Sequence, residues 1–347
     1  MKTVKIELMR PSLKLYNFHA ETAAEFKARP DIPAWDTTYY RAVTALAQQI
    51  GTCWYGHQDR DIHRCVERYR ALYQNIHRHG WNAESTINIR VEKDGVCWLV
   101  DGHHRTGILL ACHELRVERV NCNIVKRHAD WVNVVNAARA LYSDGKDRLY
   151  TEIDHPEFSD WDAASDPVKR ADVINSVLRP GSFIVDVGCN HGGISFAMAN
   201  LDHNILGIDT NMNYLRLAAE TQGVLCRSSK IELICHDAWK YIRDMPFETA
   251  DYILCLSVLH HEAKKGGGER VGELLRIMAA KAVHGVIVEL ASGEETQMHG
   301  IDIPYDQDGL GDWMGKYSGL PVRLISRGVP DSKHGTDRRR WLWMVGR

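Results

Sequence analysis

The strongest constraint on the fold lies in the second half of the chain, in the stretch SFIVDVGCNHGGIS at residues 182–195. Its first part, residues 183–187, is a short apolar run between a Pro-Gly pair and a glycine-rich turn, which is typical of a buried parallel strand. The residues after Gly193 suit the first turn of a helix. Because glycine has no side chain, such a turn lets a nucleotide-like ligand approach the backbone N–H groups and the positive helix end. The stretch therefore predicts a cofactor site between a strand and a helix.

Strand and helix patterns alternate around this turn. The spacing predicts helices at residues 167–178, 214–222 (closed by Gly223) and 269–280, and strands at residues 204–209, 231–234, 252–256 and 285–290. Two last strands follow at residues 322–326 and 341–345, with no long helix between them. The pattern predicts an α/β fold with a seven-stranded, Rossmann-like sheet that ends in an antiparallel pair. Asp209 ends the second strand, 21 positions after Gly188, where this architecture places an acid that binds ribose hydroxyls.

This region, roughly residues 165 to 347, resembles a class I S-adenosylmethionine-dependent methyltransferase. The first motif of that family, acidic-x-Gly-x-Gly-x-Gly, is similar to residues 186–192. The resemblance implies that Asp186 lies near the methionine amine and that Gly188 and Gly192 lie beneath the cofactor. Asn190 stands at the middle glycine, a modest departure because asparagine tolerates a left-handed backbone.

The resemblance also implies roles for the ends of the later strands. Asp209 looks like the ribose ligand, and Asp237 with Ala238 matches the position that grips adenine through a side-chain acceptor and a backbone N–H. Residues 256–261, which include Ser257, resemble the fourth motif, which lines the sulfonium and the acceptor. The alternative for the glycine-rich turn alone is a dinucleotide site, which explains neither the Asp-Ala pair nor the paired histidines.

Candidate catalytic groups follow the fourth and fifth strands. Methyl transfer is an in-line displacement at a sulfonium, so the protein chiefly aligns nucleophile and methyl and, where needed, removes a proton. His260 or His261 could be that base, because neutral imidazole accepts protons near pH 7. Glu289 is a second candidate. The alternative is that one histidine packs and the other only shapes the pocket.

The first half of the chain has a different order of elements. A helix from residue 61 to Gly80, a hairpin of strands at 87–91 and 96–100, and a strand at 120–125 flank the Asp-Gly-His-His-Arg motif. This order resembles the α+β ParB/sulfiredoxin-like fold over roughly residues 61 to 125. The resemblance implies a pocket for ATP, ADP or another nucleotide or phosphate, formed by Asp101, Gly102, His103, His104 and the phosphate fork Arg105.

Two features limit this second resemblance. Sulfiredoxin activity needs a cysteine where this chain has His103, and no basic DNA-binding module follows, as partition proteins would require. The alternative for the motif is a structural strand-to-helix corner whose histidines cap backbone carbonyls.

Length and charge bound the remaining expectations. A chain of 347 residues favours two domains, which we place at residues 1–135 and 166–347, with a linker and lead-in at 136–165. The lead-in is expected either to cover the cofactor or acceptor pocket or to pack between the domains. The net charge of -2 gives no global attraction for nucleic acid or an anionic membrane, so neither is an expected partner.

Cysteine usage and the chain start favour a cytoplasmic protein. The nine cysteines are scattered without a Cys-x-x-Cys pair, no signal peptide opens the chain, and no apolar run reaches spanning length. No carboxylate or cysteine joins the histidines at ligand spacing, so no metal is expected.

Three functional hypotheses result. The favoured one is an enzyme that transfers methyl groups from S-adenosyl-L-methionine to a small molecule or glycan. A bifunctional version adds a kinase in the first domain, which phosphorylates the acceptor before it is methylated. The third is a non-catalytic module that senses S-adenosylmethionine while the first domain binds nucleotide or nucleic acid.

Overall fold

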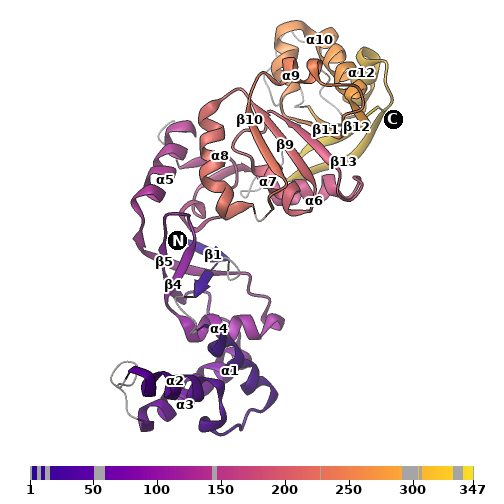
Figure 1. Cartoon of the computed structure of the whole chain (residues 1–347). Helices are drawn as coiled ribbons and strands as arrows, with labels where there is room; N and C mark the ends of the chain where they lie inside the picture. Colours follow the sequence, from indigo (N-terminus) through magenta and orange to yellow (C-terminus); the bar gives the residue numbers. More distant parts are fainter. Residues whose placement is uncertain are drawn as a thin grey trace. The chain divides into compact units, whose positions relative to one another are not determined.

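The computed structural model describes residues 2–5, 9–11, 16–50, 59–142, 147–226, 228–290, 304, 307–330 and 339–346 (Figure 1). They form two compact units. The first comprises Met1–Asn133 and His155–Asp160, and the second comprises Val134–Asp154 and Trp161–Arg347. The segment expected as linker and lead-in is thus divided between the units, with most of it in the second.

The first unit is built on a five-stranded sheet in the order β1-β5-β3-β4-β2. Its strands are β1 (Thr3–Lys5), β2 (Met9–Pro11), β3 (Thr86–Val91), β4 (Cys97–Asp101) and β5 (Arg119–Arg127). Its helices are α1 (Tyr16–Ala28), α2 (Thr38–Ile50), α3 (Asp59–His79) and α4 (His103–Ala111), with 3₁₀ turns η2 (Ala34–Asp36), η4 (His113–Leu115) and η5 (Pro156–Phe158). The predicted helix at 61–79 and the hairpin at 87–100 are present.

Helix α1 has no counterpart among the predicted elements. Its apolar residues, mostly alanine, do not form a clear helical stripe, but Phe26 is fully buried against Tyr69 of α3 and Ile108 of α4. The helix is therefore stabilised by tertiary packing, which a local pattern does not reveal.

The second unit contains a seven-stranded sheet in the order β10-β9-β8-β11-β12-β14-β13, in which only β14 pairs antiparallel. Its strands are β8 (Phe183–Val187), β9 (Asn204–Asp209), β10 (Ile231–Cys235), β11 (Ala250–Leu256), β12 (Ala282–Glu289), β13 (Val322–Pro330) and β14 (Arg339–Val345). Its helices are α6 (Pro167–Asn175), α7 (Gly193–Asn200), α8 (Met212–Leu225), α9 (Ala238–Asp244), α10 (Leu259–Lys281) and α12 (Gln307–Ser318). Helix α5 (Ala129–Tyr142) crosses the boundary between the units, and β6 (Arg148–Thr151) pairs with β7 (Asp162–Ser165) in a small separate sheet.

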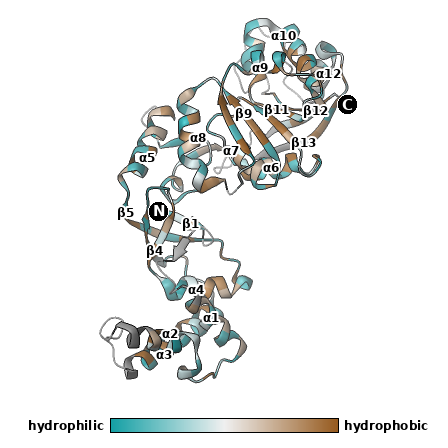
Figure 2. Cartoon of the chain, viewed as in Figure 1, coloured by the Kyte–Doolittle hydropathy of each residue, from teal (hydrophilic) through white to brown (hydrophobic). Residues whose placement is uncertain are grey.

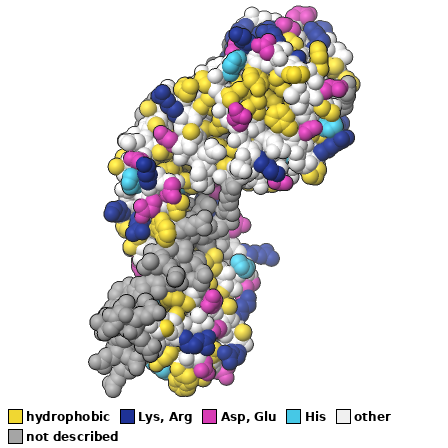
Figure 3. All heavy atoms as spheres, in the orientation of Figure 1, with side chains coloured by type: hydrophobic (Ala, Val, Ile, Leu, Met, Phe, Trp, Pro, Cys, Tyr) yellow, Lys and Arg dark blue, Asp and Glu magenta, His cyan; other side chains and the backbone are white. Residues whose placement is uncertain are grey.

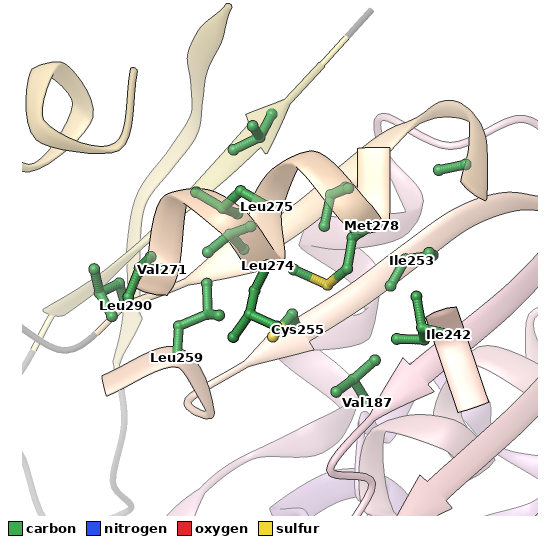
Figure 4. Packing of buried hydrophobic residues seen from close by; sticks show 14 of the residues in the cluster. Val187, Ile242, Ile253, Cys255, Leu259, Val271, Leu274, Leu275, Met278 and Leu290 are labelled. Carbon is green, nitrogen blue, oxygen red and sulfur yellow. The ribbon is translucent and has the colours of Figure 1, made fainter. Parts of the chain in front are cut away.

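Both faces of the seven-stranded sheet are covered. Alternate residues of each central strand enter two different cores, so that Val185 and Val187 face helices α9, α10 and α12 while Ile184 faces α6 and α7. The strands accordingly read as continuous apolar runs, visible as hydrophobic arrows in Figure 2. Figure 4 shows Val187 and Cys255 of the sheet beside Leu274 and Met278 of α10.

Two predicted helix boundaries were wrong, each near glycine. Helix α8 continues through Gly223 and ends at Leu225. Helix α10 begins at Leu259 rather than residue 269, and it is kinked at Gly266 and Gly267. Glycine lowers helix propensity without forbidding helix, so a local pattern misplaces such ends.

Helix α12 was also not predicted, because three of its residues are glycine. Its apolar face, Leu310, Trp313 and Met314, is buried in the core. Close packing makes small residues necessary there, since a Cβ at Gly311 would lie 2.8 Å from the Trp343 ring. The packing that stabilises the helix therefore requires glycine at position 311.

No helix in the described part of the chain is both long and apolar enough to cross a bilayer. On the face shown in Figure 3, Lys and Arg side chains are interspersed with Asp and Glu.

Candidate cofactor site

The glycine-rich turn connects the central strand β8 to α7, and its backbone is unusual. Gly188 and Gly192 have φ of 72° and 81°, and Asn190 has φ of 54°, all in the left-handed region. A Cβ on Gly188 would lie 2.6 Å from Val258 Cγ2, so glycine is required there for space as well as for conformation. The Gly188 N–H donates to the Ile208 carbonyl at 2.8 Å, which ties the turn to β9.

A cavity of about 720 Å³ opens above this turn, at the carboxyl ends of the parallel strands. Its volume falls in the range of pockets for drug-sized ligands, roughly 300–1,000 Å³. The structure brings together eight of the predicted site residues around it: Gly188, Asn190, Asp209, Asp237, Ala238, Ser257, His260 and His261. Asp186, Gly192 and Glu289 are not among its lining residues.

Asp209 is held with acceptor capacity to spare. Its Oδ2 accepts the Asn190 backbone N–H at 2.9 Å, and its Oδ1 accepts the Asn211 N–H at 2.8 Å. Each carboxylate oxygen has two lone pairs, so one backbone donor on each leaves room for two hydroxyl donors. Asp209 is thus suited to a vicinal diol such as ribose.

Asp237 and Ala238 start α9. The Asp237 Oδ1 accepts the Lys240 N–H at 3.0 Å as the N-cap, which leaves Oδ2 for another donor. The pair lies at the end of β10, beside Trp239, in the wall of the cavity. This set of groups fits an adenosine ligand: one carboxylate for the sugar, one acceptor with adjacent backbone for the base, and aromatic walls.

Asp186 is buried beneath the turn, where its Oδ2 accepts the Ser195 hydroxyl at 2.6 Å. Burial raises its pKa to about 6, although the hydrogen bond from Ser195 and the charge of Arg170 oppose the rise. Its predicted contact with the methionine amine stays a prediction.

Replacement of Asp186 with asparagine should stabilise the protein in a pH-dependent manner. Because the folded-state pKa lies above the unfolded value, folding favours the protonated carboxyl, and stability is lost as pH rises from about 4 to about 6. Asp186→Asn should therefore gain about 2 kcal/mol in free energy of unfolding at pH 7.5 and almost nothing at pH 4. Urea denaturation at both pH values measures this. The exposed Asp172→Asn on α6 is the control. An equal gain at both pH values would contradict the account.

Glu289 ends β12, as predicted, but it is not among the residues that line the cavity. Its carboxylate is buried, forms an ion pair with Arg170 of α6, and accepts the Ser257 hydroxyl. A carboxylate committed to a buried guanidinium is a poor proton acceptor, because protonation would leave that cation uncompensated. The geometry therefore assigns Glu289 to supporting Ser257 in the cavity wall.

The two histidines stand at the end of β11, in the first turn of α10. Their ring centroids are 4.0 Å apart, and both residues line the cavity. Burial and the charges of Lys264 and Lys265 lower the pKa of His261 below its usual 6.5. A neutral imidazole is therefore available at pH 7.

The motif of the first unit is tied to its own scaffold. Gly102 precedes α4 with φ of 100°, and Arg105 Nη1 donates to Ser85 Oγ and to the Thr86 carbonyl, both at 2.8 Å. Burial lowers the pKa of His103, and it lowers that of His104 to about 4. These contacts are those of a strand-to-helix corner, and the predicted nucleotide or phosphate site at Asp101–Arg105 stays a prediction.

Several cavity residues were not predicted from sequence. Four of them line the cavity: Tyr150, Tyr214, Trp239 and Lys265. Trp239 and Lys265 lie within a few positions of predicted site residues in the sequence. Their location after β10 and β11 could therefore have predicted that they line the cavity. Tyr150 precedes the first strand of the sheet, and only the fold brings it to the site. In the described part of the chain, no group of three or more His, Cys, Asp or Glu side chains is placed to hold a metal ion.

Comparisons with known proteins agree with this geometry. The family model of a methyltransferase domain matches residues 184–280. A curated relative, the O-antigen chain terminator bifunctional methyltransferase/kinase WbdD of Escherichia coli, is 30% identical over 177 residues, 48% of this chain and 24% of the relative. The match thus spans about a quarter of that relative's length.

Solved structures were also found. A crystal structure of WbdD is 25% identical with a TM-score of 0.48, covering 61% of this chain and 46% of that one. The magnesium protoporphyrin IX methyltransferase ChlM from Synechocystis PCC 6803, solved with bound S-adenosylmethionine, is 18% identical with a TM-score of 0.36, covering 52% and 79%. The family match thus identifies a methyltransferase domain within the second unit, at residues 184–280.

Proposed function

We propose that this chain transfers a methyl group from S-adenosylmethionine to a small-molecule or glycan acceptor. The observation that carries the proposal is the convergence of Asp209, Asp237-Ala238 and the His260-His261 pair on one cavity, although they follow three different strands. The relative WbdD is named an O-antigen chain terminator, which favours a glycan among the acceptors.

Each group has a chemical role in this proposal. S-adenosylmethionine, when bound, supplies a methyl group on a sulfonium sulfur. Asp209 would hold the ribose, and Asp237 with the Ala238 N–H would hold the adenine. Val258 and Leu256 would exclude water, and His260 or His261 would take the proton that the acceptor releases.

The test is an assay of the full chain with methyl-labelled S-adenosylmethionine and pools of small molecules or isolated glycans. We expect label to enter one pool. If no pool gains label while the cofactor binds, the third hypothesis, a sensor of S-adenosylmethionine, replaces this one.

The pH dependence of kcat/KM should identify the base. If His261 is the base, kcat/KM should decrease as the pH is lowered, with a midpoint below pH 6.5, because protonation removes the acceptor lone pair. His261→Gln should then lower kcat by about 10²–10⁴-fold and remove this acid limb. His260→Gln, measured in parallel, distinguishes the two imidazoles, with the exposed His113→Gln as control. An acid limb that survives in both variants would exclude a histidine base.

The kinase hypothesis rests on the first unit and on the relative's name alone. Arg105 already donates to Ser85 and Thr86, so a phosphate would have to share its guanidinium. Incubation of the full chain with ATP and the unmethylated form of the pool that accepts label measures this activity, and absence of ADP formation would reject it.

A further inference from the structure

We propose that Tyr142 and Thr151, which precede the first strand of the large sheet, position the carboxylate of Asp209 through His191 and Asn190. Both residues lie outside residues 184–280, where the methyltransferase family model matches. The inference deepens the proposed function and rests on it, because it concerns how the ribose end of the cofactor site is held. Tyr142 and Thr151 would be positioning residues.

The first step is the contact between the lead-in and the turn. His191, the fourth residue after Val187, has no exposed surface. Its Nε2 lies 2.7 Å from Thr151 Oγ1, and its Nδ1 lies 2.5 Å from the Tyr142 hydroxyl. Both ring nitrogens are therefore occupied by side chains of the lead-in.

The second step joins Tyr142 to Asn190. The Asn190 Oδ1 accepts the backbone N–H of His191 at 2.8 Å and the hydroxyl of Tyr142. Asn190 has a left-handed backbone, which a non-glycine residue adopts at a cost. These two donors to its side chain stabilise that conformation.

The third step leads to the ribose acid. In this conformation the Asn190 backbone N–H points at Asp209 and donates to Oδ2 at 2.9 Å. The lead-in thus fixes the one donor that orients this oxygen. Tyr142 contributes a second time, because its ring stacks on Tyr214 with centroids 5.6 Å apart and planes 13° from parallel, and Tyr214 lines the cavity.

The network keeps its protonation over the biological range. Burial, with the nearby Tyr214 and Asp209, raises the pKa of Tyr142, so the phenol remains a donor. Burial lowers the pKa of His191 to about 4, so the imidazole is neutral at pH 7. The contacts therefore need no counter-charge and do not switch with pH.

A packing role alone must be distinguished from positioning. The lead-in lies close to the turn, since a Cβ on Gly193 would be 2.5 Å from Thr151 Oγ1. If the lead-in only packs, its loss should weaken every ligand of the cavity equally. If the lead-in positions Asp209, its loss should weaken the binding of ligands that carry ribose hydroxyls more than that of ligands without them.

The experiment compares two ligands, S-adenosylhomocysteine and its analogue without the two ribose hydroxyls, by calorimetry on the full chain. Tyr142→Phe keeps the stacked ring and removes the hydroxyl. This variant should bind S-adenosylhomocysteine about tenfold more weakly than wild type does, and its affinity for the analogue should stay within about twofold of the wild-type value. Thr151→Val, which does not depend on the tyrosine, should act in the same direction by about threefold. Tyr252→Phe, buried on β11 outside the cavity lining, is the matched control and should change neither.

The outcomes separate the two claims. Equal weakening of both ligands, or wild-type binding of both by both variants, would overturn this inference and leave the proposed function standing. A wild-type chain that binds neither ligand would overturn both.

Discussion

Asp209→Ala should raise the dissociation constant for S-adenosylmethionine about 100-fold. The carboxylate has one backbone donor on each oxygen, at 2.9 and 2.8 Å, and lines the cavity, so two ribose hydroxyls can complete its shell. Hydrogen bonds to a charged group contribute about 1.5–3 kcal/mol each, and even partial loss of two amounts to a factor of about 100. Isothermal titration of the full chain measures the change.

The matched control is Asp172→Ala, an exposed aspartate on α6 that is not among the lining residues. Its affinity should equal that of wild type. If Asp209→Ala binds within about threefold of wild type, the carboxylate does not hold the sugar, and the assignment of the cavity fails.

Arg170→Met should destabilise the protein by about 3–5 kcal/mol, the usual cost of leaving one partner of a buried ion pair uncompensated. Arg170 and Glu289 are both buried, and they join α6 to the end of β12. Arg170 also favours the charged form of Asp186, so the loss affects two buried carboxyls. Chemical denaturation gives the free energy of unfolding.

Two further variants define the cause. The double variant Arg170→Met, Glu289→Gln keeps an acceptor for the Ser257 hydroxyl and removes the stranded charge, so it should recover most of the loss. The neighbouring Lys169→Met breaks only an exposed pair with Asp166 and should cost less than about 1 kcal/mol. A single variant Arg170→Met as stable as Lys169→Met would contradict the account.

The central strands of the second unit were predictable because they are buried on both faces. The strand predicted at residues 204–209 has the same bounds in the structure. The strand predicted before the turn, at residues 183–187, does too. Continuous apolar runs between turn signals identify such strands without tertiary information. Helix α12 is the opposite case, since Gly311 within it is explained only by the Trp343 ring that packs against it.

The site divides in the same way. Asp209, Asp237 and His260 follow parallel strands, and parallel strands bring their carboxyl ends to one edge of the sheet. Glu289 follows the same rule, but its pairing with Arg170 could not be predicted, because the two residues lie 119 positions apart. Tyr142 and Tyr150 belong to the lead-in, which was expected either to cover the pocket or to pack between the domains. The two residues could not be singled out, because their contacts depend on how that segment folds back on the turn.

The most direct test of the central claim is calorimetric titration of the wild-type chain with S-adenosylmethionine. The account predicts saturable binding of one molecule per chain, with a nonhydrolysable nucleotide unable to compete for it. Absence of binding, or displacement by that nucleotide, would show that the cavity above the β8–α7 turn binds another ligand.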